Sequence, residues 1–342
     1  MKKPEKEITI YDIAKELDIS PATVSRALAD HPAVNIKTKQ RILGAAQSMG
    51  YRSNHLASNL RTKKSNTIGV IVPRLNSNFM SDVLAGIEKV LNEAGYNLII
   101  SQSFETLQKE TTNSRSMYNN RVDGLLVSLA YESSHLEHFD AFFNRHIPVV
   151  YFDRVLENER SPGIAIDNFK AAYSITSHLI DQGCKRILHI TAQHLHTVYK
   201  QRLEGYKQAL LDHNLPVDYN LVMGSDLTLK GSADIAELIL ALPELPDGIF
   251  AVSDACAVNC IQGLKKHNIR IPEDIAVAGF NNDPLACIVE PNLTTIDYKG
   301  YEMGEASARI LLKCLNNKYN ALTDKEVILP AELIVRASTL RK

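Results

Sequence analysis

Residues 9–28 read TIYDIAKELDISPATVSRAL, and this stretch predicts two short helices joined by a tight turn. In the first helix, Thr9 can form a capping pair with Asp12. Apolar residues at helical spacing give this helix an inner face: Ile10, Ile13, Ala14 and Leu17. Ser20 and Pro21 start the second helix in the preferred way, with a hydroxyl at the N-cap and a proline at the first helical position.

A third helix is predicted to brace these two. Asn35 can cap it, and Gly50 is expected to end it. Its inward-facing residues are expected to be Ile42, Leu43, Ala46 and Met49. The three helices can share one small core, so the sequence predicts an all-α helix-turn-helix domain over residues 7–50.

The second helix presents a face that suits the major groove of DNA. Pro21 and Ala22 are short and allow close approach of the backbone, and Arg26 can reach a guanine edge with two hydrogen bonds. Thr23 and Ser25 can bond phosphates. The same pattern is typical of a plain three-helix scaffold with a surface arginine.

The distribution of charge favours DNA binding. Residues 1–64 hold twelve Lys and Arg against six Asp and Glu, whereas the rest of the chain carries a formal charge of −7. A small basic segment on a large acidic body suggests that the segment contacts a polyanion.

Residues 51–66, YRSNHLASNLRTKKSN, form a polar and basic connection in which a short helix is predicted over residues 54–60. Leu56 and Leu60 lie four residues apart, without an evident partner. The segment is either a linker or a segment that folds only on contact with a surface.

From Thr67 onward, short apolar runs alternate with helical patterns, which indicates parallel strands with helices on both faces of each sheet. About ten strands are too many for one such sheet in this length, so we expect two α/β lobes. The first lobe is expected to hold residues of about 67–166 and 298–323. The second is expected to hold residues of about 167–297 and 324–340.

Several classes of protein are disfavoured. No apolar run approaches the roughly 18 residues of a membrane span, and the charged N-terminus lacks the apolar core of a secretory signal, so a cytoplasmic location without membrane contact is expected. The five cysteines form no CxxC pair, which suits free thiols in a reducing compartment. Phosphate-loop, serine-hydrolase, zinc-protease and dinucleotide motifs are absent, so we expect no catalytic residues, no metal and no cofactor.

The motifs resemble those of the lactose/galactose-repressor (LacI) family of bacterial transcription regulators. The stretches that carry this resemblance are TIYDIAKELDISPATVSRAL, NHLASNLR, RVDGLLV, RLEGYKQAL, IPEDIAVAGF and LPAELIVRAST, and the resemblance covers residues 7–339. The resemblance implies a homodimer that binds a palindromic operator in double-stranded DNA. It also implies a periplasmic-binding-protein-like core, at residues 67–342, for a small effector that is often a sugar.

The resemblance also assigns DNA contacts. Pro21, Ala22 and Arg26 match positions that read bases, and Thr23 and Ser25 match phosphate contacts. Residues 54–60 match the hinge helix, in which Leu60 would wedge into the minor groove and kink the DNA. Further contacts are expected from Thr9, Ser20, Asn35, Tyr51, Asn54 and Ala57.

The effector is expected between the lobes, at the carboxyl ends of the parallel strands. The matching residues are Asn78, Phe79, Asp153, Arg202, Asp226, Ser253, Asp254 and Asn281. An aromatic ring with several carboxylates and amides suits a hydroxyl-rich ring, so a carbohydrate is the expected effector.

The sequence therefore predicts a ligand-responsive repressor, and two alternatives stay open. A sugar-binding protein of transport or chemotaxis would explain residues 65–342, but it needs export and leaves residues 1–64 without a role. An α/β enzyme would need a nucleophile or cofactor motif. The sequence does not identify the effector or the operator, and it does not say whether the effector weakens or strengthens DNA binding.

Overall fold

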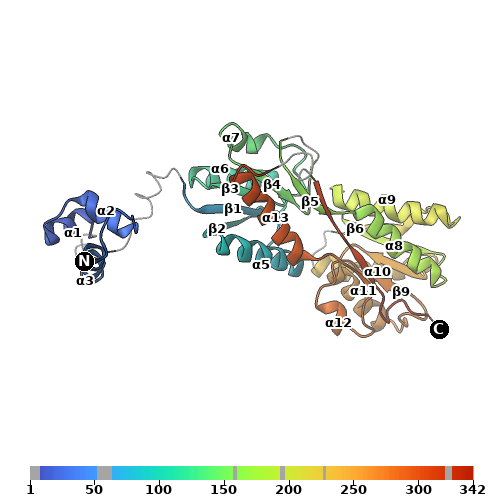
Figure 1. Cartoon of the computed structure of the whole chain (residues 1–342). Helices are drawn as coiled ribbons and strands as arrows, with labels where there is room; N and C mark the ends of the chain where they lie inside the picture. The colour runs from blue at the N-terminus through green and yellow to red at the C-terminus, as the bar shows by residue number, and fades with distance from the viewer. Residues whose placement is uncertain are drawn as a thin grey trace, which may run out of the picture. The chain divides into compact units, whose positions relative to one another are not determined.

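The computed structural model describes residues 8–51, 64–156, 160–192, 197–225, 229–319 and 326–341. The chain divides into two compact units, residues 1–65 and residues 66–342. Figure 1 shows the elements of each unit.

The first unit is helical, as expected, and contains α1 (Ile10–Leu17), α2 (Pro21–Leu28) and α3 (Ile36–Ser48). The backbone N–H of Thr9 donates to Asp12 Oδ2 at 2.8 Å, so the predicted capping pair forms. Ser20 Oγ accepts the N–H of Thr23 at 3.1 Å, and Asn35 Oδ1 caps α3 in the same way. The shared core consists of Ile13, Ala14, Val24, Ala27, Val34, Ile42 and Ala46.

One core prediction for this unit is wrong. The apolar pattern predicts that Leu43 faces inward, but its side chain is 52% exposed. Ile42 and Ala46, four residues apart, already point into the core. Leu43 follows Ile42 by about 100° around the helix, which turns it toward the surface.

The second unit, residues 66–342, is here called the body. Its first lobe contains a six-stranded parallel sheet in the order β11-β5-β4-β3-β1-β2. Its strands are β1 (Thr67–Val72), β2 (Asn97–Gln102), β3 (Gly124–Val127), β4 (Val149–Phe152), β5 (Gly163–Ile166) and β11 (Glu326–Leu329). The flanking helices are α5 (Asn78–Glu93), α6 (Leu107–Asn119), α7 (Asp140–Phe143) and α13 (Gly300–Leu315). In Figure 1, α6 and α7 lie on the face of the sheet opposite to α5.

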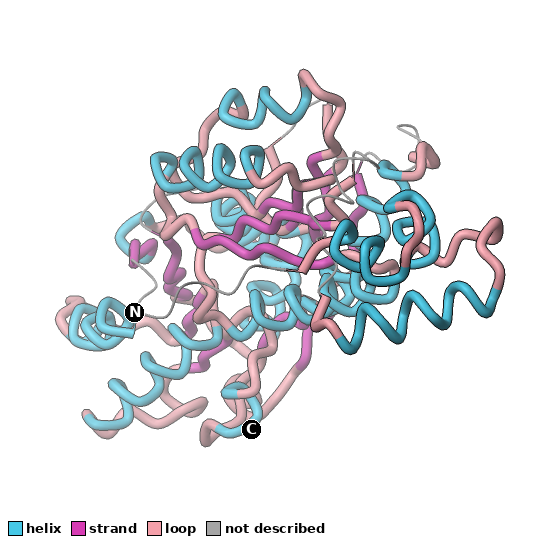
Figure 2. Tube along the Cα trace, turned by 90° about the vertical axis from the view of Figure 1, so that its left-hand side faces the viewer, coloured by secondary structure: helices cyan, strands magenta, loops and turns pink. Residues whose placement is uncertain are grey.

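The second lobe has a four-stranded parallel sheet in the order β7-β6-β8-β9. Its strands are β6 (Ile187–Ala192), β7 (Val222–Ser225), β8 (Gly248–Ala251) and β9 (Ala276–Ala278). An antiparallel pair, β10 (Thr295–Asp297) and β12 (Glu332–Ile334), accompanies it. The helices are α8 (Asn168–Asp181), α9 (Thr197–Asp212), α10 (Leu229–Leu240), α11 (Asp254–Lys266) and α12 (Leu285–Ile288). Figure 2 distinguishes the helices of the chain, in cyan, from its strands, in magenta.

The chain passes between the lobes after β5, after β10 and after β11, and this requires one correction to the expected boundaries. The predicted second lobe includes all of residues 324–340, but β11 pairs with β5 and so belongs to the first sheet. Only β12, which follows it, returns to the second lobe. The pairing of an edge strand with a distant strand leaves little trace in local sequence.

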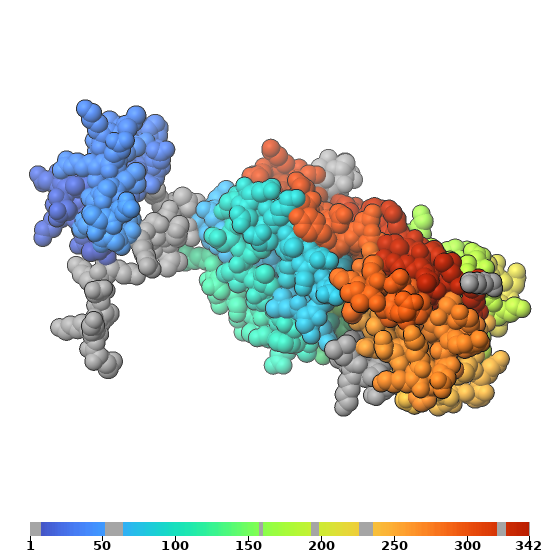
Figure 3. Space-filling model, turned by 90° about the horizontal axis from the view of Figure 1, so that it is seen from below, coloured from blue at the N-terminus to red at the C-terminus, as the bar shows by residue number. Residues whose placement is uncertain are grey.

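Helices α5 and α13 pack unusually closely, and Figure 3 shows their cyan and orange-red surfaces side by side. A Cβ atom at Gly86 would collide with the carbonyl oxygen of Tyr301, and one at Gly304 with that of Val83. Glycine at both positions therefore permits the backbones of the two helices to touch.

Candidate DNA-binding surface and ligand cavity

The exposed face of α2 carries the residues predicted to read DNA. Ala22 and Arg26 are exposed four residues apart on one face, whereas Val24 and Ala27 point into the core. Arg26 forms no side-chain hydrogen bond or ion pair with any described residue, so its guanidinium group is available to a partner. Pro21, Thr23 and Ser25 are partly exposed.

The other predicted DNA contacts divide into two groups. Thr9, Ser20 and Asn35 occupy helix N-termini, where their side chains bond the first turn, and Tyr51 packs partly buried against the small core. Asn54, Ala57 and Leu60, together with the predicted helix over residues 54–60, lie outside the described residues.

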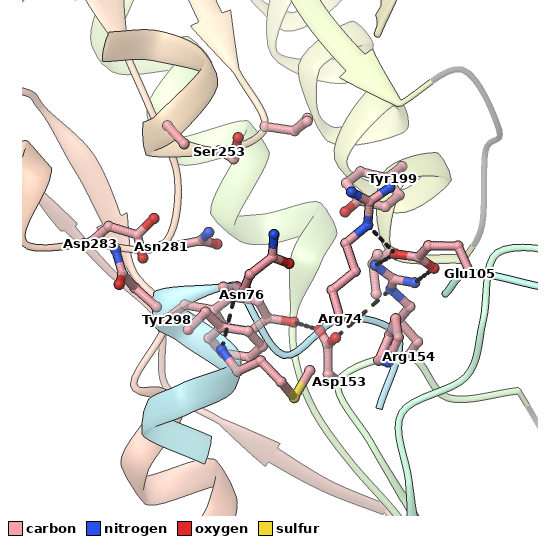
Figure 4. Close-up of a pocket in the computed structure, with 18 of the residues that line it drawn as sticks. Arg74, Asn76, Glu105, Asp153, Arg154, Tyr199, Ser253, Asn281, Asp283 and Tyr298 are labelled. Carbon is pink, nitrogen blue, oxygen red and sulfur yellow. Dashed lines mark hydrogen bonds and ion pairs between the residues drawn. The ribbon is translucent and has the colours of Figure 1, made fainter. Parts of the chain in front are cut away.

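In the body, a cavity of about 580 Å³ opens between the two lobes. The first lobe contributes residues that follow β1, β2, β3 and β4, and the second contributes residues from α9, from the start of α11 and from the segment after β9. Figure 4 shows the side chains that point into it. The predicted effector residues that line the cavity are Asn78, Phe79, Asp153, Arg202, Ser253 and Asn281.

Asp254 does not line the cavity, which corrects the expectation for this residue. Its side chain is fully buried, and it accepts hydrogen bonds from the N–H of Asp283 at 2.7 Å and from the hydroxyl of Thr295 at 2.6 Å. It therefore ties α11 to the segment after β9 and to β10. Burial raises the pKa of Asp254 to about 7. Asp226 lies outside the described residues.

An aromatic pair forms one wall of the cavity. The rings of Phe79 and Tyr298 stack at 4.4 Å between centroids, with 12° between their planes. The hydroxyl of Tyr298 donates to Asp153 Oδ1 at 2.6 Å, and Ser128 donates to Asp153 Oδ2 at 3.2 Å. Burial and the neighbouring Asp153 raise the pKa of Tyr298 well above its ordinary value, so the phenol keeps its proton.

Arg202 is held rigidly in the second lobe, where it is only 3% exposed. Its Nε donates to Asn168 Oδ1 at 2.9 Å, and Nη1 donates to the carbonyl of Val252 at 3.0 Å. The guanidinium carbon lies 3.6 Å from the centre of the Phe280 ring. Since no carboxylate among the described residues forms an ion pair with it, Arg202 presents a buried positive charge beside the cavity.

The first lobe contributes a charged cluster of its own to the lining, formed by Arg154 and Glu105. Arg154 Nη1 and Nη2 donate to the two oxygens of Glu105 at 2.6 and 3.2 Å. The guanidinium of Arg154 also lies over the ring of Tyr131, 4.1 Å from its centre. The hydroxyl of Tyr131 donates to that of Tyr199 at 3.1 Å, which links the two lobes across the cavity.

Several cavity residues were not predicted from the sequence: Arg74, Asn76, Glu105, Tyr131, Arg154, Tyr199, Asn259, Asp283 and Tyr298. A signal existed for some of them, because Arg74, Glu105 and Tyr131 follow strands β1, β2 and β3 at their carboxyl ends. Asn259 is notable because its Nδ2 is buried without a hydrogen-bond partner among the described residues. A ligand in the cavity can supply the missing acceptor.

His189 is a core residue of β6. Its ring stacks between those of Tyr206 and Phe250, and its Nδ1 lies 3.1 Å from the carbonyl of Phe250. Burial lowers its pKa to about 3, so it is neutral in the folded protein.

Among the described residues, no helix combines the length and apolar character that crossing a membrane requires.

A basic helix-turn-helix unit followed by a two-lobed α/β body with a cavity between its lobes defines a DNA-binding regulator. Two family models match the chain: "Bacterial regulatory proteins, lacI family" over residues 9–54, and "Periplasmic binding protein-like domain" over residues 176–339. The HTH-type transcriptional regulator RegA of Clostridium saccharobutylicum is 32% identical over 335 residues, which cover 97% of this chain and 99% of RegA.

Solved structures show the same architecture. The lac repressor dimer bound to operator and the anti-inducer ONPF matches with a TM-score of 0.86 at 22% identity, covering 98% of this chain and 100% of that one. A LacI family regulator from Enterococcus faecium with bound ribose matches with a TM-score of 0.71 at 26% identity, covering 80% of this chain and 98% of that one. The chain belongs to the lacI family of bacterial regulatory proteins, and it is a DNA-binding transcription regulator.

Proposed function

We propose that this protein is a cytoplasmic repressor, not an enzyme, that binds a palindromic operator as a homodimer and is controlled by a small carbohydrate in the cavity of the body. The observation that carries this proposal is the lining of the cavity. It combines a stacked aromatic pair with a dense set of amide, hydroxyl, carboxylate and guanidinium groups.

This lining suits a sugar because a sugar ring is apolar on its C–H faces and carries hydroxyls around its edge. The Phe79–Tyr298 stack offers a flat apolar surface, while Asn281, Ser253 and Asn259 offer donors and acceptors at its margin. A volume of about 580 Å³ lies within the range of small-molecule sites. The bound ribose in the relative from Enterococcus faecium supports the same class of ligand.

Two carboxylates of the lining, Asp153 and Glu105, are engaged by neighbouring donors. Asp153 is occupied by two hydroxyl donors, and Glu105 is occupied by Arg154. A carboxylate held in this way is a poor general base, because its lone pairs are engaged by neighbouring donors.

DNA binding is proposed for the face of α2 that carries Ala22 and Arg26, with phosphate contacts from Thr23 and Ser25. The cavity is built from both lobes, so a ligand in it stabilises one relation of the lobes over others. A change in that relation can alter operator affinity through residues 51–66, and this coupling is reciprocal.

A thermal-shift screen with neutral sugars, sugar acids and sugar phosphates tests the proposal. At least one of these compounds is expected to raise the melting temperature of the full chain and also to change its affinity for operator DNA. A compound that binds in the cavity without any effect on DNA affinity would contradict the regulatory part of the proposal.

A further inference from the structure

The part of the cavity wall formed by Arg74, Glu105 and Arg154, here called the basic end, holds more positive than negative charge. Glu105 receives both N–H groups of Arg154 at hydrogen-bonding distance, and it also accepts the N–H of Tyr131 at 3.3 Å. Arg74 is farther away, with its Nε 3.6 Å from Glu105 Oε1. Glu105 is therefore held by hydrogen bonds to Arg154, whereas Arg74 contacts it only through a longer ion pair that a ligand anion can replace.

Arg74 is also placed to meet a ligand. Its side chain is 39% exposed, whereas those of Glu105 and Arg154 are 10% and 9% exposed. It lines the cavity and makes no hydrogen bond to any residue of the described ranges. A guanidinium group carries five N–H donors in a planar fork that matches the oxygens of a carboxylate or a phosphate.

Of the remaining charges of the lining, Asp153 offsets part of the positive charge at the basic end, and Arg202 contributes a further positive charge. Asp153 lies near Arg154, at 3.9 Å from its Nε, while Arg202 adds a buried positive charge that no described carboxylate pairs. Asp283 lies at the far side of the cavity beside Asn281, away from the basic end (Figure 4). A negative group on a ligand is therefore attracted to Arg74 and repelled by Asp283.

We propose that the effector is an anionic carbohydrate whose carboxylate or phosphate group is bound by Arg74 at the basic end. This inference rests on the proposed function, because it takes the cavity to be the effector site. It narrows the ligand from carbohydrates in general to sugar acids or sugar phosphates, and it makes Arg74 the residue that determines this specificity.

The test is calorimetric titration of the full chain with matched series: glucose, glucuronate and glucose 6-phosphate; galactose, galacturonate and galactose 6-phosphate; ribose, ribonate and ribose 5-phosphate. In at least one series, the acid or the phosphate is expected to bind about 10-fold or more tightly than the neutral sugar, the range of one charge-assisted interaction. Comparison of the acid with the phosphate identifies which anion is recognised.

Arg74→Gln is expected to bring the anionic compound to within about 3-fold of the neutral sugar, because this variant removes the charge and the planar fork that favour the anion. Arg115→Gln is the matched control, because Arg115 is an exposed residue of α6 outside the cavity lining, and this variant should retain the full preference. Arg74→Lys keeps the charge without the fork and should lie between.

The outcomes separate this inference from the proposed function. Neutral sugars that bind as tightly as the anionic compounds would overturn the inference and leave the carbohydrate effector standing. An anionic preference that persists in Arg74→Gln would overturn the role of Arg74. If no compound of any series bound, the proposed carbohydrate effector would itself be contradicted.

Discussion

Replacing Arg202 by alanine removes three interactions at once and is expected to destabilise the body measurably. The side chain donates to Asn168 and to the carbonyl of Val252, and it lies over the ring of Phe280. Hydrogen bonds from a charged group contribute about 1.5–3 kcal/mol each, and a desolvated cation–π contact contributes about 2 kcal/mol. The variant also avoids the free-energy cost of burying the guanidinium charge, which offsets part of these losses. We therefore expect a net decrease of about 3 kcal/mol in the free energy of unfolding.

The functional consequence follows from where these interactions lie. All three partners belong to the second lobe, so Arg202→Ala should leave the DNA-binding unit and operator affinity without ligand intact. Effector binding should be abolished, because a cavity-lining donor is removed.

The assay is urea unfolding followed by circular dichroism, since the chain has no tryptophan, together with operator binding by fluorescence anisotropy. Asn168→Ala is the control, because it removes one of the Arg202 hydrogen bonds and leaves the cavity lining unchanged. A loss below about 1 kcal/mol, or unchanged effector affinity, would refute the reasoning.

Three further predictions concern other parts of the molecule. Arg26→Ala should cost about 1–3 kcal/mol of discrimination at one base pair of each half-site, measured by anisotropy with operator variants, and equal loss on all variants would mean that Arg26 contacts only phosphate. Gly304→Ala should destabilise the body by about 1–3 kcal/mol in urea, because its Cβ collides with the carbonyl of Val83. Gly44→Ala on α3, where a Cβ has free space, should stabilise its unit by about 0.5–1 kcal/mol. Destabilisation by Gly44→Ala together with stabilisation by Gly304→Ala would refute the packing argument. Asp254 has a pKa raised from 3.8 to about 7, so the stability contributed by its protonated form is full below pH 3.8 and is lost as the pH rises through 7. Asp254→Asn should therefore lose less stability than the wild type between about pH 5 and pH 8, by up to about 3 kcal/mol, and parallel pH profiles would contradict this.

Much of the fold could be predicted from local patterns. The helix-turn-helix unit follows from caps at Thr9, Ser20 and Asn35 and from the spacing of apolar residues, all of which are local signals. The alternation of apolar runs and helices predicts two α/β lobes in the same way. The exception is β11, because its partner β5 is distant in the sequence and the choice between two sheets depends on tertiary contacts.

The cavity was partly predictable for a geometric reason. Side chains that follow parallel strands collect at one edge of a sheet, which brings together Asn78, Asp153 and Ser253. The same rule does not resolve adjacent residues: Ser253, the N-cap of α11, lines the cavity, whereas Asp254, the first residue of that helix, turns toward Thr295. Tyr298 was missed because it follows β10, whose position depends on its pairing with β12.

Operator affinity measured with and without a cavity ligand tests the central claim most directly. The operator is first obtained by selection from random DNA with the full chain, and the ligand is taken from the thermal-shift screen. We predict that saturating ligand changes the Kd for this DNA by about 5-fold or more, the usual range of coupling between two sites, and that Arg202→Ala abolishes the change. The same Kd with and without the ligand would contradict the account.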